Sequence, residues 1–522
     1  MDEITLRERA DQLFEFALAQ TKNSPALRSL HQDLQHCYQK LDLPMRVAVV
    51  GKIKAGKSTM MNAILGEALV ATGNVEATFN INWLRYAKQQ SLQVHFKDNR
   101  PPEPKSFEEL ATITVRADAN RSYLRSIKYI EVFHPNPILQ TFDLIDTPGL
   151  ESFYKDDSDN TIEFLQLHGK ELSEITQTET ANADAVLYLF SHSASAQDRD
   201  TIQQFQGNIA GRTTPINSVG VLTKVDMYWN EYPNPMDAGR RIAERLATDP
   251  QMRNLLYTIV PVCGLPAFGA QTIEPIEFDI LTKLAKLPEE RFDKLILTVE
   301  RFTTKNYPDE PDIPAISERL QVFTRLGRYG IWRGCKLIRA GVTDLAEFIS
   351  QLLQESGVQE LRNLVKSHFG NRAFLIKLST GIEQILGSCF RQKQQATADI
   401  QVVKEIAGRF ERIKAQAHEF QELRVLRSYY ENKLDFATEE VGMLLQVTGE
   451  DGSACAKRLG LDERATISEM LPIAESKMNY WRIRANDLMG ADSQTIEAAR
   501  VLAHSYERVL YHVNAAKRHL YF

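Results

Sequence analysis

Residues 45–59 constrain the fold of this chain more than any other segment. A short apolar run rich in β-branched residues (45–50) is followed by G-x-x-x-x-G-K-S-T (51–59), and the pattern then continues as a helix (60–65). A strand, a glycine-rich loop and a helix in this order form the phosphate-binding P-loop. In that loop backbone N–H groups and the helix N-terminus face the phosphate. The sequence therefore predicts an α/β domain that binds a nucleotide.

Each position of the loop has an expected task. Gly51 and Gly56 let the backbone wrap a phosphate, because glycine tolerates the conformations that this needs. Lys57 is placed to reach the β- and γ-phosphates, and Ser58 is placed to ligate Mg²⁺. The nucleotide-binding residues predicted here are Gly51, Lys52, Ala55, Gly56, Lys57, Ser58 and Thr59.

A second buried strand, predicted at 142–146, ends in the motif D-x-x-G. We expect its Asp146 to hold Mg²⁺ through water, and the amide of Gly149 to sense the γ-phosphate. This strand therefore supplies the metal side of the predicted site.

A third buried strand, predicted at 219–223, ends in T-K-x-D. The Asp226 carboxylate can accept two hydrogen bonds, from N1–H and the 2-amino group of guanine, while the stem of Lys224 lies over the base. Adenine lacks that pair of donors, so the motif selects guanine. The predicted base-site residues are Thr223, Lys224, Asp226 and Cys263, the last at the end of a fourth strand. A P-loop ATPase with an accidental T-K-V-D is the remote alternative.

The intervals between the motifs are longer than a minimal GTPase needs. Lys57 and Asp146 are 89 residues apart, and the interval contains period-two apolar patterns at 79–83, 92–96 and 129–133. Such alternation predicts added strands of the sheet. Residues 97–105, rich in proline and charge, are expected to form a solvated loop.

Together these motifs resemble the dynamin superfamily, and most of all its bacterial dynamin-like branch. The resemblance lies in 56–66 with the segment 73–78, and in the strand 183–190 followed by Gln197 and Asp198. It covers the GTPase half of the chain and is specific there. A more diffuse similarity to the helical stalk of the bacterial family begins near residue 356.

The resemblance assigns roles to two further residues. Thr78, 21 residues after Lys57, stands where dynamins carry the switch-I threonine, with Thr72 as its rival. Where dynamins have a glutamine and a serine that helps bind a monovalent cation, this chain has Ile53 and Lys54. Related guanylate-binding proteins have an arginine at the second position, so Lys54 either supplies that charge or faces solvent. The predicted catalytic residues are Lys54, Lys57, Thr78 and Gly149, and the predicted metal ligands are Ser58, Thr78 and Asp146.

Composition excludes several other classes. The 522 residues carry a net charge of −6, which argues against general attraction to nucleic acid or anionic lipid. The five cysteines are far apart and form no metal-ligand cluster, so reduced thiols of a cytoplasmic protein are expected. The first residues lack the apolar core of a signal peptide. No run of 18 apolar residues occurs, so we predict no transmembrane span.

Both flanks of the GTPase segment have helical periodicity. The predicted fold is an α/β GTPase domain with a mixed, mostly parallel sheet, joined to an elongated helical stalk built from both chain ends. The predicted domains are 1–43 (N-terminal helices that join the stalk), 44–305 (GTPase) and 306–522 (helical bundle), and the proline-rich stretch 306–314 is the predicted linker.

Within the predicted bundle, apolar residues recur at heptad spacing from 403 to 420. Continued to 434, the pattern predicts one helix of up to about 50 residues, ~75 Å long. A break is expected at 448–453, followed by helices at 463–488 and 493–519. Apolar residues near 443–462 form either a lipid-contacting tip or a cap of the bundle. The basic, aromatic segment 328–339 is either a lipid surface or, as we favour, a core face backed by solvated charges.

The resemblance implies a mechanochemical enzyme that hydrolyses GTP with Mg²⁺. It further implies self-association through the GTPase domain, as a homodimer or larger assembly, and peripheral lipid contact at the stalk tip, with membrane remodelling. A cytoplasmic location, with or without peripheral membrane attachment, follows from this, and nucleic acid is not an expected partner. The alternative is a regulatory large GTPase whose stalk binds a protein partner without touching lipid.

Overall fold

The computed structural model forms two compact units. It describes residues 5–51, 55–70, 80–98, 100–110, 113, 121–146, 183–191, 217–230, 234–249, 252, 255–394, 399–430, 433–487 and 492–520. The first unit consists of Arg46–Thr214 and Ser218–Leu364, and the second of Met1–Met45, Pro215–Asn217 and Val365–Phe522. Here we call them the sheet unit and the helical unit, and we describe each by itself.

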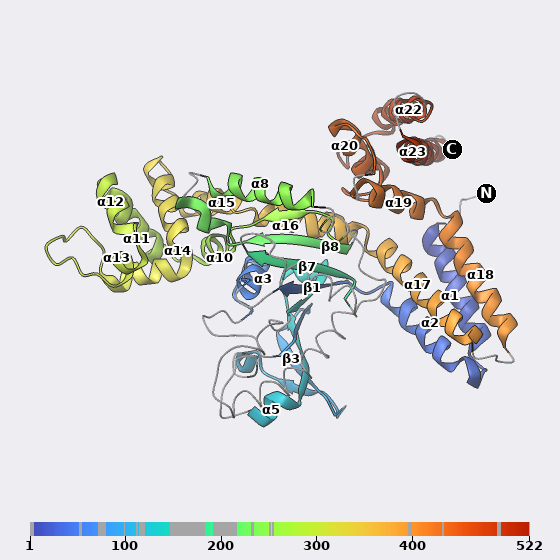
Figure 1. Ribbon diagram of the computed structural model, residues 1–522, viewed down its shortest axis with the longest axis horizontal. Coiled ribbons are helices and arrows are strands. Elements are labelled where there is room, and N and C mark those ends of the chain that lie inside the picture. The colour runs from blue at the N-terminus through green and yellow to red at the C-terminus, as the bar shows by residue number, and fades with distance from the viewer. Residues whose placement is uncertain are drawn as a thin grey trace. The chain divides into compact units, whose positions relative to one another are not determined.

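A nine-stranded sheet is the centre of the sheet unit, as far as its residues are described (Figure 1). Its strand order is β4-β3-β5-β2-β6-β1-β7-β8-β9. The pairs β1–β7, β7–β8, β8–β9 and β2–β5 are parallel, and β2–β6, β3–β4 and β3–β5 are antiparallel. The strands are β1 Met45–Gly51, β2 Asn82–Tyr86, β3 Ser91–Phe96, β4 Glu103–Lys105, β5 Ile127–His134, β6 Phe142–Asp146, β7 Ala185–Ser191, β8 Ser218–Thr223 and β9 Ile259–Pro261.

The predicted strands are present, with two differences of detail. The strand expected at 79–83 lies at 82–86, where Asn82 pairs with both Ile130 and Asp146. The prediction of a loop throughout 97–105 is wrong at its end, because 103–105 form β4. This short edge strand contains a proline, which an edge tolerates since one side of it needs no ladder hydrogen bond. The mixed, mostly parallel sheet is thus confirmed.

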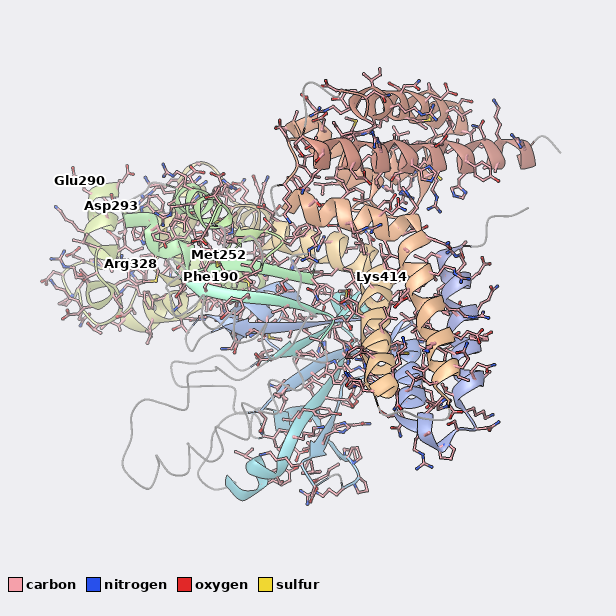
Figure 2. The ribbon with its side chains drawn as sticks, turned by 45° about the vertical axis from the view of Figure 1, so that its right-hand side comes forward. Phe190, Met252, Glu290, Asp293, Arg328 and Lys414 are labelled. Carbon is pink, nitrogen blue, oxygen red and sulfur yellow. The ribbon has the colours of Figure 1, made fainter. Side chains whose placement is uncertain are left out.

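Helices cover the sheet, so its central strands are buried on both sides. All seven residues of β1 and all six of β8 are buried, which explains why they are continuous apolar runs instead of alternating ones. Phe190 of β7 and Met252 belong to the same core cluster and lie close together in Figure 2. The helices of the unit are α3 Lys57–Leu65, α5 Arg121–Ser126, α8 Pro235–Ala247, α10 Gly264–Thr272, α11 Pro275–Lys286, α12 Glu289–Ile296, α13 Val299–Thr303, α14 Ile316–Arg339, α15 Leu345–Gln354 and α16 Val358–Leu364.

Helices α10–α15 build a second core of their own, with Phe292, Phe302 and Phe348 at its centre. The proline-rich stretch 306–314 lies within this region and both of its neighbours belong to the sheet unit. Arg319, only 1% exposed, holds it there by donating to the carbonyls of Pro314, Phe302 and Lys305. The compact unit therefore extends to Leu364, whereas the GTPase domain was expected to end at 305. The limits of the functional domains stay a prediction.

The segment 328–339 has its apolar residues in the core, as favoured from the sequence. Ile331 and Cys335 are fully buried. Its basic residues have protein partners: Arg328, labelled in Figure 2, donates to the Leu297 carbonyl at 2.8 Å, and Arg333 pairs with Glu355. A lipid surface is not needed to explain these charges.

The helical unit joins the two ends of the chain, as predicted. Helices α1 Leu6–Thr21 and α2 Arg28–Lys40 pack against α18 and α17, and Phe14 meets Phe410 edge-on with ring centroids 5.2 Å apart. The remaining helices are a π-helix at Val365–Gly370, then α17 Ala373–Gln394, α18 Ile400–Gln416, α19 His418–Tyr430, α20 Thr438–Val447, α21 Cys455–Arg458, α22 Ile467–Arg484 and α23 Ser493–Leu520.

The prediction of one long helix from 403 to 434 is wrong. α18 ends at Gln416, and Ala417 has the extended backbone conformation (φ −72°, ψ 125°) before α19 begins. The heptad positions are nevertheless buried on both sides of the break. α18 packs on α17 and α1, whereas α19 packs on α23. The chain therefore bends so that one continuous apolar pattern fills two different cores.

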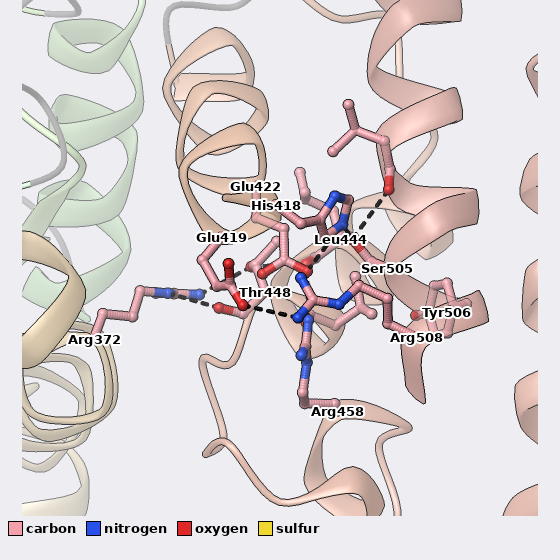
Figure 3. Close-up of polar contacts among 12 residues, drawn as sticks. Arg372, His418, Glu419, Glu422, Leu444, Thr448, Arg458, Ser505, Tyr506 and Arg508 are labelled. Atoms are coloured by element: carbon pink, nitrogen blue, oxygen red, sulfur yellow. Dashed lines mark hydrogen bonds and ion pairs between the residues drawn. The ribbon is translucent and has the colours of Figure 1, made fainter. Parts of the chain in front are cut away.

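A polar network connects α19, α21 and α23 inside the helical unit (Figure 3). The Nε2 atom of His418 lies 2.7 Å from the Ser505 hydroxyl, and Arg458 pairs with Glu422. Arg508 pairs with Glu419 at 3.0 Å. Such networks lock the register of the helices that share them.

The structure also bears on whether residues 443–462 form a lipid-contacting tip or a cap of the bundle. Leu444, Val447 and Leu459 are almost fully buried. This favours the cap of the bundle over a lipid-inserting tip. Among the residues that the structure describes, no helix combines the length and the apolar character needed to cross a membrane.

Candidate nucleotide-binding site

Two glycines shape the P-loop. Gly51 ends β1 so close to β7 that a Cβ atom there would lie 2.5 Å from the Leu189 carbonyl oxygen. Gly56, which precedes α3, has φ +88°, a left-handed conformation that costs other residues about 1–2 kcal/mol. Both positions therefore require glycine for physical reasons. Gly51 is the last residue of β1, and Gly56 directly precedes the first residue of α3.

Lys57 begins α3 and is folded back into the loop. Its side chain is largely buried, and Nζ donates to the Gly51 carbonyl at 2.9 Å. An ammonium group carries three donors in total. The loop thus holds a cation above the end of β1, where the phosphates of a nucleotide are expected.

The T-K-x-D motif is tied directly to the P-loop. β1, β7 and β8 are parallel, so Gly51 and Thr223 end at the same edge of the sheet. The Thr223 hydroxyl lies 2.7 Å from the Ala55 carbonyl and 3.2 Å from the Phe190 carbonyl. Thr223 therefore acts on the site by fixing the two motifs to each other.

The residues after Thr223 form a strained turn that presents Asp226. Lys224 has φ +57°, the only left-handed conformation of a non-glycine residue among those described. Such strain is concentrated at functional sites. Asp226 follows at the start of a 3₁₀ helix, Val225–Asn230, and is partly exposed. Burial by the surrounding protein raises the pKa of its carboxyl to about 6, an effect that the nearby Lys224 reduces.

Cys263 lies beneath this carboxylate instead of in the open site. It is fully buried, its sulfur is 3.6 Å from that of Met236, and burial raises the pKa of its thiol well above the ordinary value. Its backbone N–H donates to the Ser356 carbonyl at 2.9 Å. The side chain therefore belongs to the floor under Asp226, and contact of this loop with guanine stays a prediction.

Oxygen donors suited to Mg²⁺ are present on the phosphate side. Asp146 is a fully buried carboxylate at the end of β6, and the hydroxyl residue Ser58 follows Lys57 at the N-terminus of α3. Mg²⁺ prefers such hard oxygen ligands together with phosphate oxygens, so the residues fit the metal. The other predicted residues of this side, Lys52, Lys54, Thr78 and Gly149, lie outside the described residues, as does Thr72.

Sequence patterns gave no indication of one residue that supports the site, Arg362 of α16. Its guanidinium donates to the carbonyls of Ala63 and Ile64 at 2.7 Å each, and also to Gln271. These two carbonyls belong to the last turn of α3, where a cation interacts favourably with the helix dipole. Burial lowers the pKa of this guanidinium. Arg362 thus caps the helix whose other end is the P-loop.

Comparison with known proteins agrees with this geometry. A model described as the dynamin family matches residues 47–225, which run from β1 to the T-K-x-D motif. The segment that carries the nucleotide motifs is thus similar to the dynamin family. The isoniazid-induced protein IniC of Mycobacterium tuberculosis is 27% identical over 482 residues, 92% of each chain. Dynamin-like protein 2 of Campylobacter jejuni is 32% identical over 155 residues, 29% of this chain and 25% of that protein.

A solved structure of an oligomerised bacterial dynamin pair also aligns with this chain. The alignment covers 97% of this chain and 90% of the other, at 14% identity and a TM-score of 0.32. At that score it supports no inference about how the units are arranged.

Proposed function

We propose that this dynamin-like large GTPase binds GTP at the carboxyl edge of its sheet and hydrolyses it to GDP and phosphate with Mg²⁺. The observation that carries the proposal is the contact between Thr223 and Ala55, because it couples the guanine-selecting motif to the phosphate-binding loop. Asp226 selects the base, and Lys57 binds the phosphates. A nucleotide held at both ends in this way is positioned for phosphoryl transfer.

In the proposed reaction the protein supplies position and charge, with little covalent chemistry. Mg²⁺, when bound, neutralises charge on the β- and γ-phosphates, and Ser58, Asp146 and Thr78 are the residues proposed to hold it. The Gly149 amide is proposed to contact the γ-phosphate. Thr78 closes only around a triphosphate, so its replacement by alanine should suppress hydrolysis while binding persists.

The decisive experiment is calorimetric titration of nucleotide-free protein with GDP, GTP and ATP, together with an assay of phosphate release. We expect guanine nucleotides alone to bind, Lys57→Ala to abolish binding, and Lys283→Ala, an exposed lysine paired with Glu318, to change nothing. Asp226→Asn should weaken GTP and admit xanthosine triphosphate, whose 2-oxo group prefers an amide donor. ATP competing as well as GTP would overturn the proposal.

We further propose that GTPase domains pair through their nucleotide faces and that Lys54 replaces the monovalent cation of dynamins. A fixed ammonium in the P-loop neutralises transition-state charge without K⁺. Turnover per molecule should then rise with protein concentration and change little between K⁺, Na⁺ and choline salts. A strict K⁺ requirement, or Lys54→Ser with full turnover in choline, would remove Lys54 from the mechanism.

For coupling to membranes, the proposed function is membrane binding or remodelling, and the second candidate is regulation through a protein partner of the helices. The buried state of Leu444, Val447 and Leu459 argues against insertion of these side chains into lipid at the region 443–462. Co-sedimentation with liposomes, with and without GTP, separates the two. Nucleotide-dependent sedimentation supports the first, and its absence with every lipid composition supports the second.

A further inference from the structure

Two asparagines, one just before β2 and one at its first position, contain buried acceptor atoms. Asn80 is fully buried, and Asn82 is only 4% exposed. The Oδ1 atom of each has no hydrogen-bond partner among the residues that the structure describes. A buried acceptor without a donor is unfavourable, and in native proteins such an atom indicates a strained, catalytic or ligand-binding position.

The two asparagines differ in what surrounds them. Asn80 has a task within the fold, because its Nδ2 atom donates to the Ile113 carbonyl at 3.1 Å. Asn82 lies directly opposite Asp146 in the antiparallel ladder of β2 and β6, so both side chains project from the same face of the sheet. The Cβ atoms of residues paired in this way are about 4.5–5.5 Å apart. Since an ionised carboxylate only accepts hydrogen bonds, the Asn82 oxygen requires a donor from outside this pair.

This face of the sheet is the one on which the metal ligands are predicted. Ile81 and Ile145 alternate with Asn82 and Asp146, and both belong to the core that contains residues of α8. Asn82 and Asp146 therefore point away from that core. No described residue of α3 belongs to that core either, and α3, with Ser58 in its first turn, packs against β6. Asn82 thus lies beside Asp146 on the side of α3.

A water molecule of a hydrated Mg²⁺ ion satisfies the needs of both side chains. Mg²⁺ bound in proteins usually keeps several waters. A water that binds the metal through its oxygen has two protons to donate, one for the Asp146 carboxylate and one for the Asn82 Oδ1 atom. The charge of the ion also makes such a water a stronger donor than free water. Acceptors that hold the ligands of a metal in this way orient them and raise its affinity.

We propose that Asn82 is a positioning residue for Mg²⁺, whose Oδ1 atom accepts from a water of the metal's hydration shell that also donates to Asp146. This role rests on the proposed function, because it requires Mg²⁺ at Asp146. Asn82 belongs to none of the nucleotide motifs. Because its hydrogen bond forms only when the metal is bound, Asn82 contributes to Mg²⁺ affinity and not to the stability of the free protein.

The test measures Mg²⁺ affinity and stability separately in the full-length protein. Calorimetry gives the affinity of Mg²⁺ for the complex of the protein with GDP, and GDP titration in EDTA gives the affinity without metal. Asn82→Leu keeps the size of the side chain and removes the acceptor. It should weaken Mg²⁺ binding about tenfold, while GDP binding in EDTA stays within a factor of about two.

Gln392→Leu is the matched control. The Gln392 Oε1 atom is likewise buried and without a partner in the described part of the chain, but it lies on α17 of the helical unit. Both substitutions remove an unsatisfied group, so the urea midpoint of the free protein should stay unchanged or rise in each. Only Asn82→Leu should weaken Mg²⁺ binding. Asn82→Asp keeps an acceptor oxygen and should retain Mg²⁺ affinity within about threefold at pH 8.

The proposal is overturned if the unmodified protein binds GDP and Mg²⁺ and Asn82→Leu binds Mg²⁺ as tightly as Gln392→Leu does. It is also overturned if Asn82→Leu lowers the urea midpoint, because Asn82 would then be bonded within the free protein. An equal loss of Mg²⁺ affinity in Asn82→Asp and Asn82→Leu would contradict the role of the acceptor. If the unmodified protein binds no GDP or no Mg²⁺, the proposed function itself fails, and the role of Asn82 fails with it.

Discussion

Protonation of Asp226 should control the affinity for guanine nucleotides. Burial raises the pKa of this carboxyl to about 6 in the protein without nucleotide. Guanine donates two hydrogen bonds to the ionised carboxylate, and a protonated carboxyl loses one acceptor position. Binding at low pH must therefore first expel the proton. Each pH unit below the pKa lowers the ionised fraction of Asp226 about tenfold. The dissociation constant for GDP should therefore be about tenfold larger at pH 5 than at pH 8.

The sign of the effect on folding is opposite. Asp226 binds its proton more tightly in the folded protein than in the unfolded chain, for which the ordinary pKa is 3.8. Its contribution to the free energy of unfolding is therefore largest at low pH and falls as the pH rises from about 4 to about 6. Nucleotide binding and folding thus respond to the same proton in opposite directions.

Calorimetry with GDP and excess Mg²⁺, in pairs of buffers with different ionisation enthalpies, measures this proton directly. About half a proton should be released per GDP bound near pH 6, and almost none at pH 8. Asp226→Asn should lose the release. Asp237→Asn, which alters an exposed carboxylate paired with Arg240, should retain it. An affinity that is flat from pH 5 to 8, or proton release that survives in Asp226→Asn, would refute the reasoning.

Three further substitutions test the supports of the site. Arg362→Ala should cost about 2 kcal/mol in urea denaturation, because the last carbonyls of α3 lose their buried donor, and Arg362→Lys should recover part of it. Gly51→Ala should abolish GDP binding, measured by calorimetry, because its Cβ would overlap the Leu189 carbonyl; unchanged affinity would contradict the close approach. Thr223→Val should cost about 1 kcal/mol of stability and weaken GDP by removing the contact with Ala55, while Thr223→Ser retains both.

The strands that carry the nucleotide motifs could be predicted from the sequence for a simple reason. A run of apolar residues bounded by a glycine-rich loop or an acidic motif has to be a buried strand, and parallel strands bring their carboxyl ends to one edge. Gly51, Asp146 and Thr223 meet these conditions. Arg362 does not, because an isolated arginine some 300 residues after α3 has no local pattern that marks it as a cap.

The bend at Ala417 shows what periodicity leaves undetermined. The heptad pattern specifies which side of a helix is buried, and it is correct on both sides of the bend. It does not specify the partner. His418, the first residue after the bend, contacts Ser505 of α23, and that contact exists only once the last helix of the chain has packed. The direction of α19 is thus set by residues almost 90 positions away.

The same reasoning applies to the limit of the sheet unit. Prolines at 306–314 prevent a helix from continuing, and that local property suggested a linker. The contacts instead attach this proline-rich loop to the sheet unit, because Arg319 donates hydrogen bonds to the carbonyls of Pro314 and Lys305. Farther on, Ser356 accepts from the backbone of Cys263, and Gly357 approaches so closely that a Cβ would lie 2.4 Å from the Pro261 carbonyl. The segment from 356 to 362 therefore touches the base end of the site through β9 and its phosphate end through α3. A chain segment with these two attachments belongs to the nucleotide-binding unit, whatever its local composition.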